Sequence, residues 1–173
     1  PAGDLVMRRE DFLRVRGFDE SIQTNEDYEL CDRVRKAGMP VRAFPHIGVV
    51  HLGTAQSLKI FYRKQCWHGT HVVKVFLRDP LHSDNKNAVL FAAYTLACVA
   101  ALAASMAIGF WRGKWAPSLI ALCALLLPPV LLASRRVVAK RKFSDFIPLA
   151  ALYFVYGLAR GRALLNIGKT RGR

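Results

Sequence analysis

The sequence predicts an α/β domain at its N-terminal side, followed by a helical transmembrane region. Strand-like and helix-like patterns alternate over residues 1–55, which suits an α/β layer. Two later runs, 88–111 and 116–134, are apolar and free of charged residues. Residues 1–87 hold 14 basic and 11 acidic residues, whereas 88–173 hold 12 basic residues and one acidic residue. Basic residues beside apolar runs are typical of membrane proteins, and they argue against nucleic acid as the partner.

Five short elements are expected in the N-terminal part. Residues 4–9 are predicted as a strand, and 10–15 as a helix with acidic residues in its first turn. A second helix is predicted at 25–37, where apolar residues recur at helical spacing. Two further strands are predicted at 41–44 and 47–51, on either side of a proline.

The helix predicted at 25–37 has recognisable ends. Thr24 is expected to be its N-cap, with Asp27 at the third helical position as the partner in a capping box. Basic residues fill the last turn, where the helix dipole favours them, and Gly38 stops the helix. We therefore expect two adjacent carboxylates, those of Glu26 and Asp27, in the first turn of this helix.

Residues 56–87 are predicted as an interfacial helix and a linker. Apolar and aromatic residues fall near one face of a helix at 56–78, and basic residues fall mostly on the other. This pattern is typical of a helix that lies on a membrane surface. An ordinary surface helix packed on its own domain has the same pattern, and the sequence does not choose between them.

Residues 88–173 are predicted as a membrane region. Each apolar run approaches or exceeds the ~20 residues that cross a bilayer core about 30 Å thick. Trp111 and Trp115 lie at the end of the first run, as aromatic residues do at membrane interfaces. Pro128 and Pro129 can bend the second run, but a span tolerates them if neighbouring groups bind the carbonyl groups that prolines leave free.

A third apolar segment, 143–159, has two possible placements. The basic cluster at 135–142 marks the cytoplasmic side, and a third span would put the basic tail at 160–173 outside. We therefore favour two spans with a surface-lying or re-entrant third segment, and three spans are the alternative. The expected location is the inner (plasma) membrane, with the N-terminal domain in the cytoplasm and more than one pass through the bilayer.

Several polar residues are candidates for sugar-transfer chemistry. Transfer of a sugar from a nucleotide to a hydroxyl group needs a carboxylate that takes the proton and a cation that neutralises the leaving diphosphate. Asp27 fits the base, because the N-terminus of a helix favours the ionised carboxylate. Gln65 and Trp67 are placed to bind an acceptor, and His51 is placed to bind a metal ion. The alternatives are a helix cap for Asp27, a membrane-interface anchor for Trp67 and a hydrogen-bonded strand end for His51.

Four segments, taken in order, resemble the second half of a family-2 glycosyltransferase of the GT-A fold. They are Leu5–Phe12, Arg16–Glu20, Asn25–Gly38 and Val49–Gly53. The resemblance covers about residues 1–78. It implies that residues 1–55 form part of a GT-A catalytic domain whose nucleotide-binding N-terminal half is absent.

The resemblance also implies roles for individual residues. Asp27 takes the place of the catalytic base, and Glu26 supports it or contacts the acceptor. Gly17 and Phe18 line the acceptor site, and His51 helps to bind a divalent cation, Mg²⁺ or Mn²⁺. The family's Gln-x-x-Arg-Trp motif is not present, since the chain has Gln-Cys-Trp-His at 65–68.

The expected activity is inverting transfer from a nucleotide-sugar donor to a lipid-linked or cell-envelope glycan acceptor at the cytoplasmic membrane face. The sequence has no glycine-rich phosphate loop and no Asp-x-Asp motif. We therefore expect residues 1–173 alone to be inactive, because donor binding needs the missing half. The competing hypothesis is a non-catalytic membrane anchor or scaffold with a small α/β head.

Overall fold

The computed structural model describes residues 5–44, 46, 53–80 and 85–166. This part of the chain contains six α-helices, one short 3₁₀ turn and no β-strand. The predicted α/β fold is therefore wrong for these residues. The resemblance to family-2 glycosyltransferases fails with it, because the GT-A fold is built around a Rossmann-like β-sheet.

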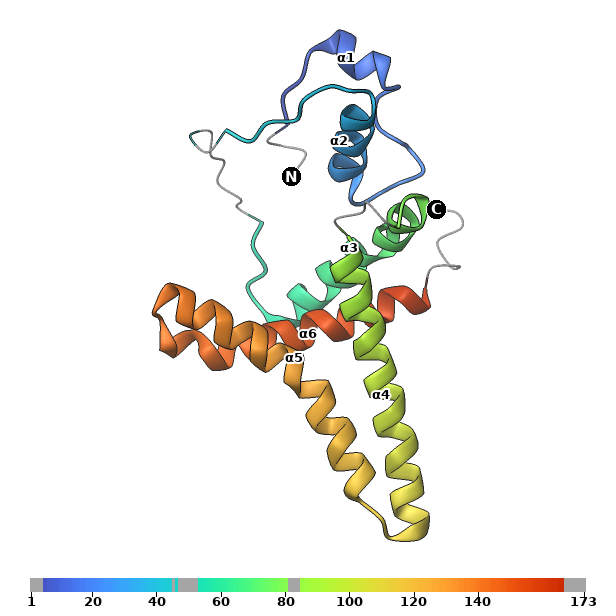
Figure 1. Cartoon of the computed structure of the whole chain (residues 1–173), viewed down its shortest axis with the longest axis vertical. Coiled ribbons are helices and arrows are strands. Elements are labelled where there is room, and N and C mark those ends of the chain that lie inside the picture. Colours follow the sequence, from blue (N-terminus) through green and yellow to red (C-terminus); the bar gives the residue numbers. More distant parts are fainter. Residues whose placement is uncertain (1–4, 45, 47–52, 81–84, 167–173) are drawn as a thin grey trace.

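A small helical head occupies one end of the molecule (Figure 1). It consists of α1 (Arg9–Arg14) and α2 (Glu26–Lys36) and the segments around them. Val15, Leu30 and Val34 are buried at its centre. The helix predicted at 25–37 is thus confirmed, and Gly38 follows it in the left-handed conformation, with φ of 78°.

The segments predicted as strands do not form a sheet. Residues 5–8 and 41–44 are irregular, and Leu5, Met7 and Val41 pack against the buried cluster that includes Leu30 and Val34 of α2. The segment predicted at 47–51 lies outside the described residues. Two or three short strands need a further layer or partner strands to be stable, whereas an adjacent helix face buries their apolar side chains directly.

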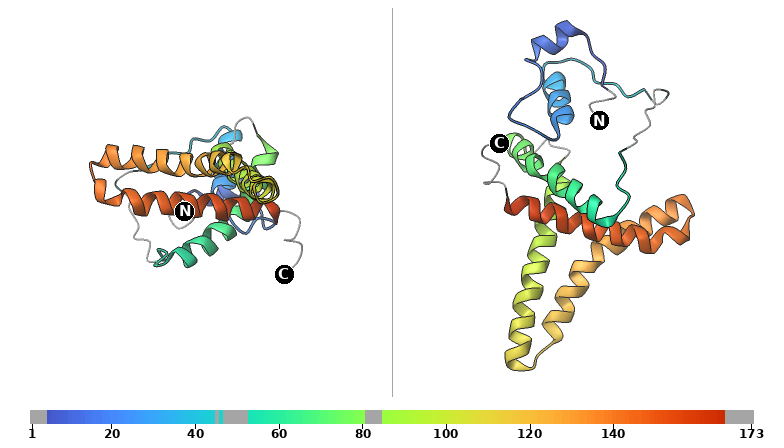
Figure 2. Two further views of the ribbon diagram at one scale, coloured as in Figure 1. Left: turned by 90° about the horizontal axis from the view of Figure 1, so that it is seen from below. Right: turned by 180° about the vertical axis from the view of Figure 1, so that it is seen from behind.

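Two long helices cross the middle of the molecule and pack closely on one another (Figure 2). They are α3 (Leu58–Arg78) and α6 (Phe146–Leu165). The helix predicted at 56–78 is confirmed, with Ser57 accepting the N-terminal capping hydrogen bond. Close approach of the two helices depends on Gly69, since a Cβ at that position would lie 2.5 Å from the Cβ of Ala163.

The predicted capping box at the start of α2 does not form. Asn25 occupies the N-cap position in the left-handed conformation, and its side chain makes no capping hydrogen bond. Thr24 is instead buried, and its hydroxyl group donates to the carbonyl oxygen of His68 on α3 at 3.4 Å. The Thr24 side chain, which the local pattern assigns to the cap, binds α3 instead.

The remaining two helices form an antiparallel hairpin. They are α4 (Lys86–Arg112) and α5 (Ala116–Lys140), joined at Gly113, where φ is 65°. Figure 1 shows the joined ends extending away from all the other helices, and α5 changing direction midway to run beside α6. The short 3₁₀ turn η2 (Phe143–Asp145) then connects α5 to α6.

Prolines account for the bend in α5. Pro128 and Pro129 lie inside the helix, and proline has no N–H group to donate to the carbonyl group four residues earlier. For Pro128 that carbonyl belongs to Ala124. The Tyr94 hydroxyl group on α4 donates to the Ala124 oxygen at 2.8 Å and so replaces the missing helical bond.

Two helices, α4 and α5, are long and apolar enough to cross a membrane. Only 22% and 28% of their most apolar windows are buried in the protein, which distinguishes them from core helices of a soluble domain. The third apolar segment forms α6, which packs on α4 through Gly157 and Gly161. A Cβ at Gly157 would lie 2.7 Å from the Thr95 hydroxyl oxygen, so the small residues allow this contact.

Candidate functional site

The N-terminus of α2 faces the middle of α3. Glu26 and Asp27 are both half-buried there, and an Asp27 carboxylate oxygen accepts a hydrogen bond from the Tyr28 N–H group at 2.7 Å. Both carboxylates interact electrostatically with His68. The structure thus brings the predicted base close to the stretch of α3 that carries the predicted acceptor-binding residues.

His68 is the titratable group at this junction. Burial lowers its pKa, and the positive charge of Arg160 on α6 lowers it further, while Glu26 and Asp27 oppose the shift. The net direction is down, so the imidazole is neutral at pH 7. A neutral imidazole beside two carboxylates can accept or relay a proton.

Arg160 brings α6 into the same junction. Its Nη2 atom donates to the Gln65 side-chain oxygen at 3.2 Å, and its guanidinium carbon lies 5.1 Å from the centre of the Tyr156 ring. Its Nε and Nη1 atoms are buried and have no hydrogen-bond partner among the described residues. Trp67 is half-exposed at the edge of the junction, with its ring centre 4.8 Å from that of His68.

The other predicted acceptor residues, Gly17 and Phe18, lie in the segment between α1 and α2. The Gly17 carbonyl oxygen accepts a hydrogen bond from Arg33 at 2.6 Å, and Phe18 packs edge-on against Phe12 with ring centres 5.4 Å apart. Gly17 has a φ of 63° and ends the turn after α1, as expected. These contacts assign Gly17 and Phe18 to the packing of the head.

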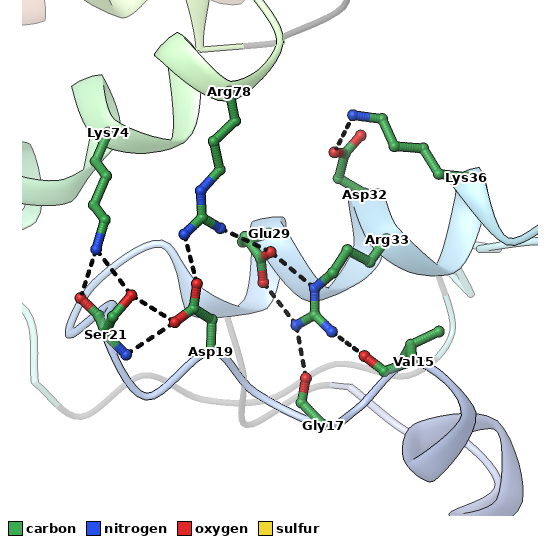
Figure 3. Close-up of polar contacts among 10 residues, drawn as sticks. All are labelled: Val15, Gly17, Asp19, Ser21, Glu29, Asp32, Arg33, Lys36, Lys74 and Arg78. Atoms are coloured by element: carbon green, nitrogen blue, oxygen red, sulfur yellow. Dashed lines mark hydrogen bonds and ion pairs between the residues drawn. The ribbon is translucent and has the colours of Figure 1, made fainter.

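A network of charged residues fastens the head to α3, and the sequence did not reveal it. Arg78 donates to Asp19 at 2.6 Å and to Glu29 at 3.1 Å, and Glu29 also binds Arg33 at 2.7 Å (Figure 3). The Glu29 side chain is only 7% exposed, so its charge is compensated by two guanidinium groups. We call Asp19, Glu29, Arg33 and Arg78 the clasp.

Two further contacts reinforce the clasp from either side. Lys74 donates to the Ser21 hydroxyl group at 2.8 Å, and Lys36 pairs with Asp79 at 2.7 Å. Hydrogen bonds from Ser21 and then Arg78 hold the pKa of Asp19 well below its usual range, so this carboxylate stays charged at neutral pH. The ion pair between Asp19 and Arg78 is therefore present at physiological pH, and it joins the head to α3.

Part of this network carries a signal in the sequence. Glu29 and Arg33 are four residues apart on one helix, which is the spacing of a helical ion pair. Asp19 and Arg78 are far apart in the chain, and no local pattern connects them.

The predicted metal ligand, His51, lies outside the described residues. In the part that the structure describes, no three His, Cys, Asp or Glu side chains are arranged so that they could hold a metal ion.

Comparison with protein-family models, curated proteins and solved structures finds no match to this chain.

Proposed function

We propose that this chain is a membrane anchor that holds the α1–α2 head at the cytoplasmic surface of the bilayer. The observation that carries the proposal is the α4–α5 hairpin, which extends away from the other helices with exposed apolar side chains. Phe110 is 82% exposed and Ile120 is 70% exposed. A soluble protein would leave this surface in water, whereas the bilayer core removes it from water at about 25 cal/mol per Å².

The length of α4 and the residues at the joined ends support a crossing. With 27 residues, α4 has a length of about 40 Å, which exceeds the ~30 Å bilayer core. At the joined ends, Trp111 and Trp115 are exposed beside Arg112 and Lys114, which suits the far interface. The basic residues at 135–142 then lie on the near side, which the positive-inside rule assigns to the cytoplasm.

On this proposal, α3 and α6 are the surface helices that connect the head to the hairpin. The clasp holds the head on α3, and α3 packs on α6 through Gly69. Because α6 packs on both α3 and α4, continuous helix contacts join the head to the hairpin. The chain thereby acts as a scaffold that sets the position of the head relative to the membrane.

Epitope tags test this arrangement in intact cells. One tag is inserted at Gly113, in the hairpin turn, and a second is placed after Arg173. External protease should cleave the first tag and spare the second until the membrane is permeabilised. Protection of the first tag would contradict a crossing hairpin, and cleavage of the second in intact cells would require a third span.

A second candidate function is sugar transfer at the membrane face, with Asp27 as general base. It is favoured by the position of Glu26 and Asp27 against the α3 segment that holds Gln65 and His68. The donor would be a nucleotide sugar with a divalent cation, and the acceptor a lipid-linked or cell-envelope glycan. The sequence has no glycine-rich phosphate loop, so on this candidate the donor site would be supplied by residues outside 1–173.

Asp27→Asn tests this second candidate in the full reading frame that contains these residues. The variant should abolish incorporation of labelled sugar into the lipid extract while leaving donor binding intact. Asp32→Asn is the matched control, because Asp32 lies on the same helix in a surface ion pair with Lys36. Equal incorporation by the Asp27→Asn variant and the unmodified protein would exclude Asp27 as the base.

A further inference from the structure

A groove opens where α5 bends away from α4. It has a volume of about 690 Å³, within the range of ~300–1,000 Å³ that small-molecule sites occupy. The bend at Pro128 separates the two helices, and α6 closes only one side of the resulting wedge. Apolar and aromatic side chains form its walls: Ala88, Phe91, Pro128, Leu131, Leu132, Tyr153 and Tyr156.

The groove has one charged residue among its lining residues. Arg135 lies one helical turn beyond Leu131 on α5 and is exposed. Its side chain has no ion pair or hydrogen bond within the described part of the chain. Asn87, in the first turn of α4, is the other polar lining residue that is not a tyrosine. The groove is therefore apolar along its walls, with a cation and an amide in its lining.

The aromatic wall of the groove is held in place by its neighbours. The rings of Phe91 and Tyr156 stack with centres 6.0 Å apart, and the Arg160 guanidinium group lies over Tyr156. A smaller hollow of about 370 Å³ shares Tyr153 and Tyr156 and has Arg136 in its lining. A second positive charge thus lies beside the same aromatic edge of α6.

These observations point to an amphipathic anion. We propose that the groove binds an anionic phospholipid of the bilayer, with an acyl chain along the apolar walls and the phosphate group at Arg135. Charge complementarity supports this occupant, because the one acidic residue of 88–173 is Asp145, and it pairs with Lys142 at 3.2 Å. The groove therefore has no acidic side chain of this region beside Arg135, which leaves its guanidinium group open to an anion. The proposal rests on the membrane anchoring proposed above.

The guanidinium group suits a phosphate for a geometric reason. Its planar set of N–H groups can form two parallel hydrogen bonds to phosphate oxygens, which a lysine ammonium group cannot. Hydrogen bonds to charged groups contribute more than neutral ones, so loss of this contact should be measurable in a single variant. Since Arg135 is exposed, replacing it should leave the helix packing intact.

The test measures lipid binding to the full chain in a neutral detergent. Short-chain phosphatidylglycerol is titrated and bound lipid is counted by native mass spectrometry, with phosphatidylcholine of the same chain length as comparison. Arg135→Gln should weaken phosphatidylglycerol binding roughly tenfold. Lys140→Gln, on the same helix end but outside the groove, should change it by less than about twofold. Leu131→Trp should fill the groove and reduce the binding of both lipids.

Four results would overturn the proposal. Arg135→Gln could bind phosphatidylglycerol as well as the unmodified protein does. Lys140→Gln could lose as much affinity, which would indicate diffuse attraction to a basic surface. Phosphatidylcholine could bind equally well, or glycerol phosphate without acyl chains could displace the lipid at equal concentration. Because binding is measured in detergent, failure of the tag experiment and failure of this one are separate results.

Discussion

Tyr94→Phe removes a single hydroxyl group that compensates for a proline in the neighbouring helix. Pro128 leaves the Ala124 carbonyl group without its helical partner, and the Tyr94 hydroxyl group binds it at 2.8 Å. Without that bond, the carbonyl oxygen stays unpaired in apolar surroundings. Such a group costs about 1–3 kcal/mol, whereas hydrogen bonds between membrane helices average about 0.6 kcal/mol with a maximum near 1.7. We expect Tyr94→Phe to lower the free energy of unfolding by about 1 kcal/mol.

The background of Pro128→Ala provides the control. Alanine restores the N–H group at this position, so the helix itself can bind the Ala124 carbonyl oxygen. Tyr94→Phe should then cost almost nothing, and the coupling energy of the double-mutant cycle should be about 1 kcal/mol. The measurement is unfolding of the purified protein in mixed micelles with increasing dodecyl sulfate, followed by far-UV circular dichroism.

Two outcomes would refute this reasoning. If Tyr94→Phe costs the same in both backgrounds, the hydroxyl group stabilises the protein through some contact other than the freed carbonyl. If it costs nothing in the unmodified protein, the Ala124 carbonyl group does not need the bond. Either result would remove the explanation of how α5 tolerates its bend.

Two further predictions concern the connections between the head and the membrane helices. Arg78→Leu removes the partner of Asp19 and one of the two partners of Glu29, so amide hydrogen exchange in α2 should become faster while α4 and α5 stay protected. We expect a loss of about 1–3 kcal/mol, and unchanged exchange would contradict the clasp. The pKa of Asp19 is lowered in the folded protein, so the charged carboxylate stabilises the folded state at neutral pH. This stabilisation is lost as the pH falls below about 4, and the same exchange measurement should detect the loss. Gly69→Ala should lower the free energy of unfolding by about 1–3 kcal/mol, because the added methyl group overpacks against Ala163. Ala163→Gly in the same chain should restore the stability. If Gly69→Ala causes no loss, or Ala163→Gly gives no rescue, α3 and α6 do not touch at this point.

Most helices could be predicted from the sequence because their signals are local. The periodicity at 25–37 and 56–78 and the apolar runs after residue 88 depend on neighbours within a few turns. Helix boundaries shifted by a few residues: α5 continues to Lys140, beyond the predicted end of the apolar run, because Arg135 and its neighbours are compatible with a helix.

The strands could not be predicted reliably, because a short apolar segment forms a strand only if it finds a partner. In the segment 41–44, Val41 instead packs against the core of the head, and the other three residues are exposed. The capping box failed for a similar reason, since Thr24 binds His68 on another helix. The resemblance to a glycosyltransferase half rested on four other segments, most specifically on Asn25–Gly38, and it failed because the described residues form no sheet.

By itself, the sequence determined which segments are helical and which two of them are long and apolar enough to cross a membrane. It also determined where positive charge gathers, because all three properties depend on composition and short-range spacing. Only the tertiary structure decided that Arg78 binds Asp19 and that Arg135 lines an apolar groove. It also decided that the Tyr94 hydroxyl group binds the carbonyl group that Pro128 leaves without a helical partner. The physical reason is that each of these contacts joins separate helices, and their relative placement follows from packing across the whole molecule.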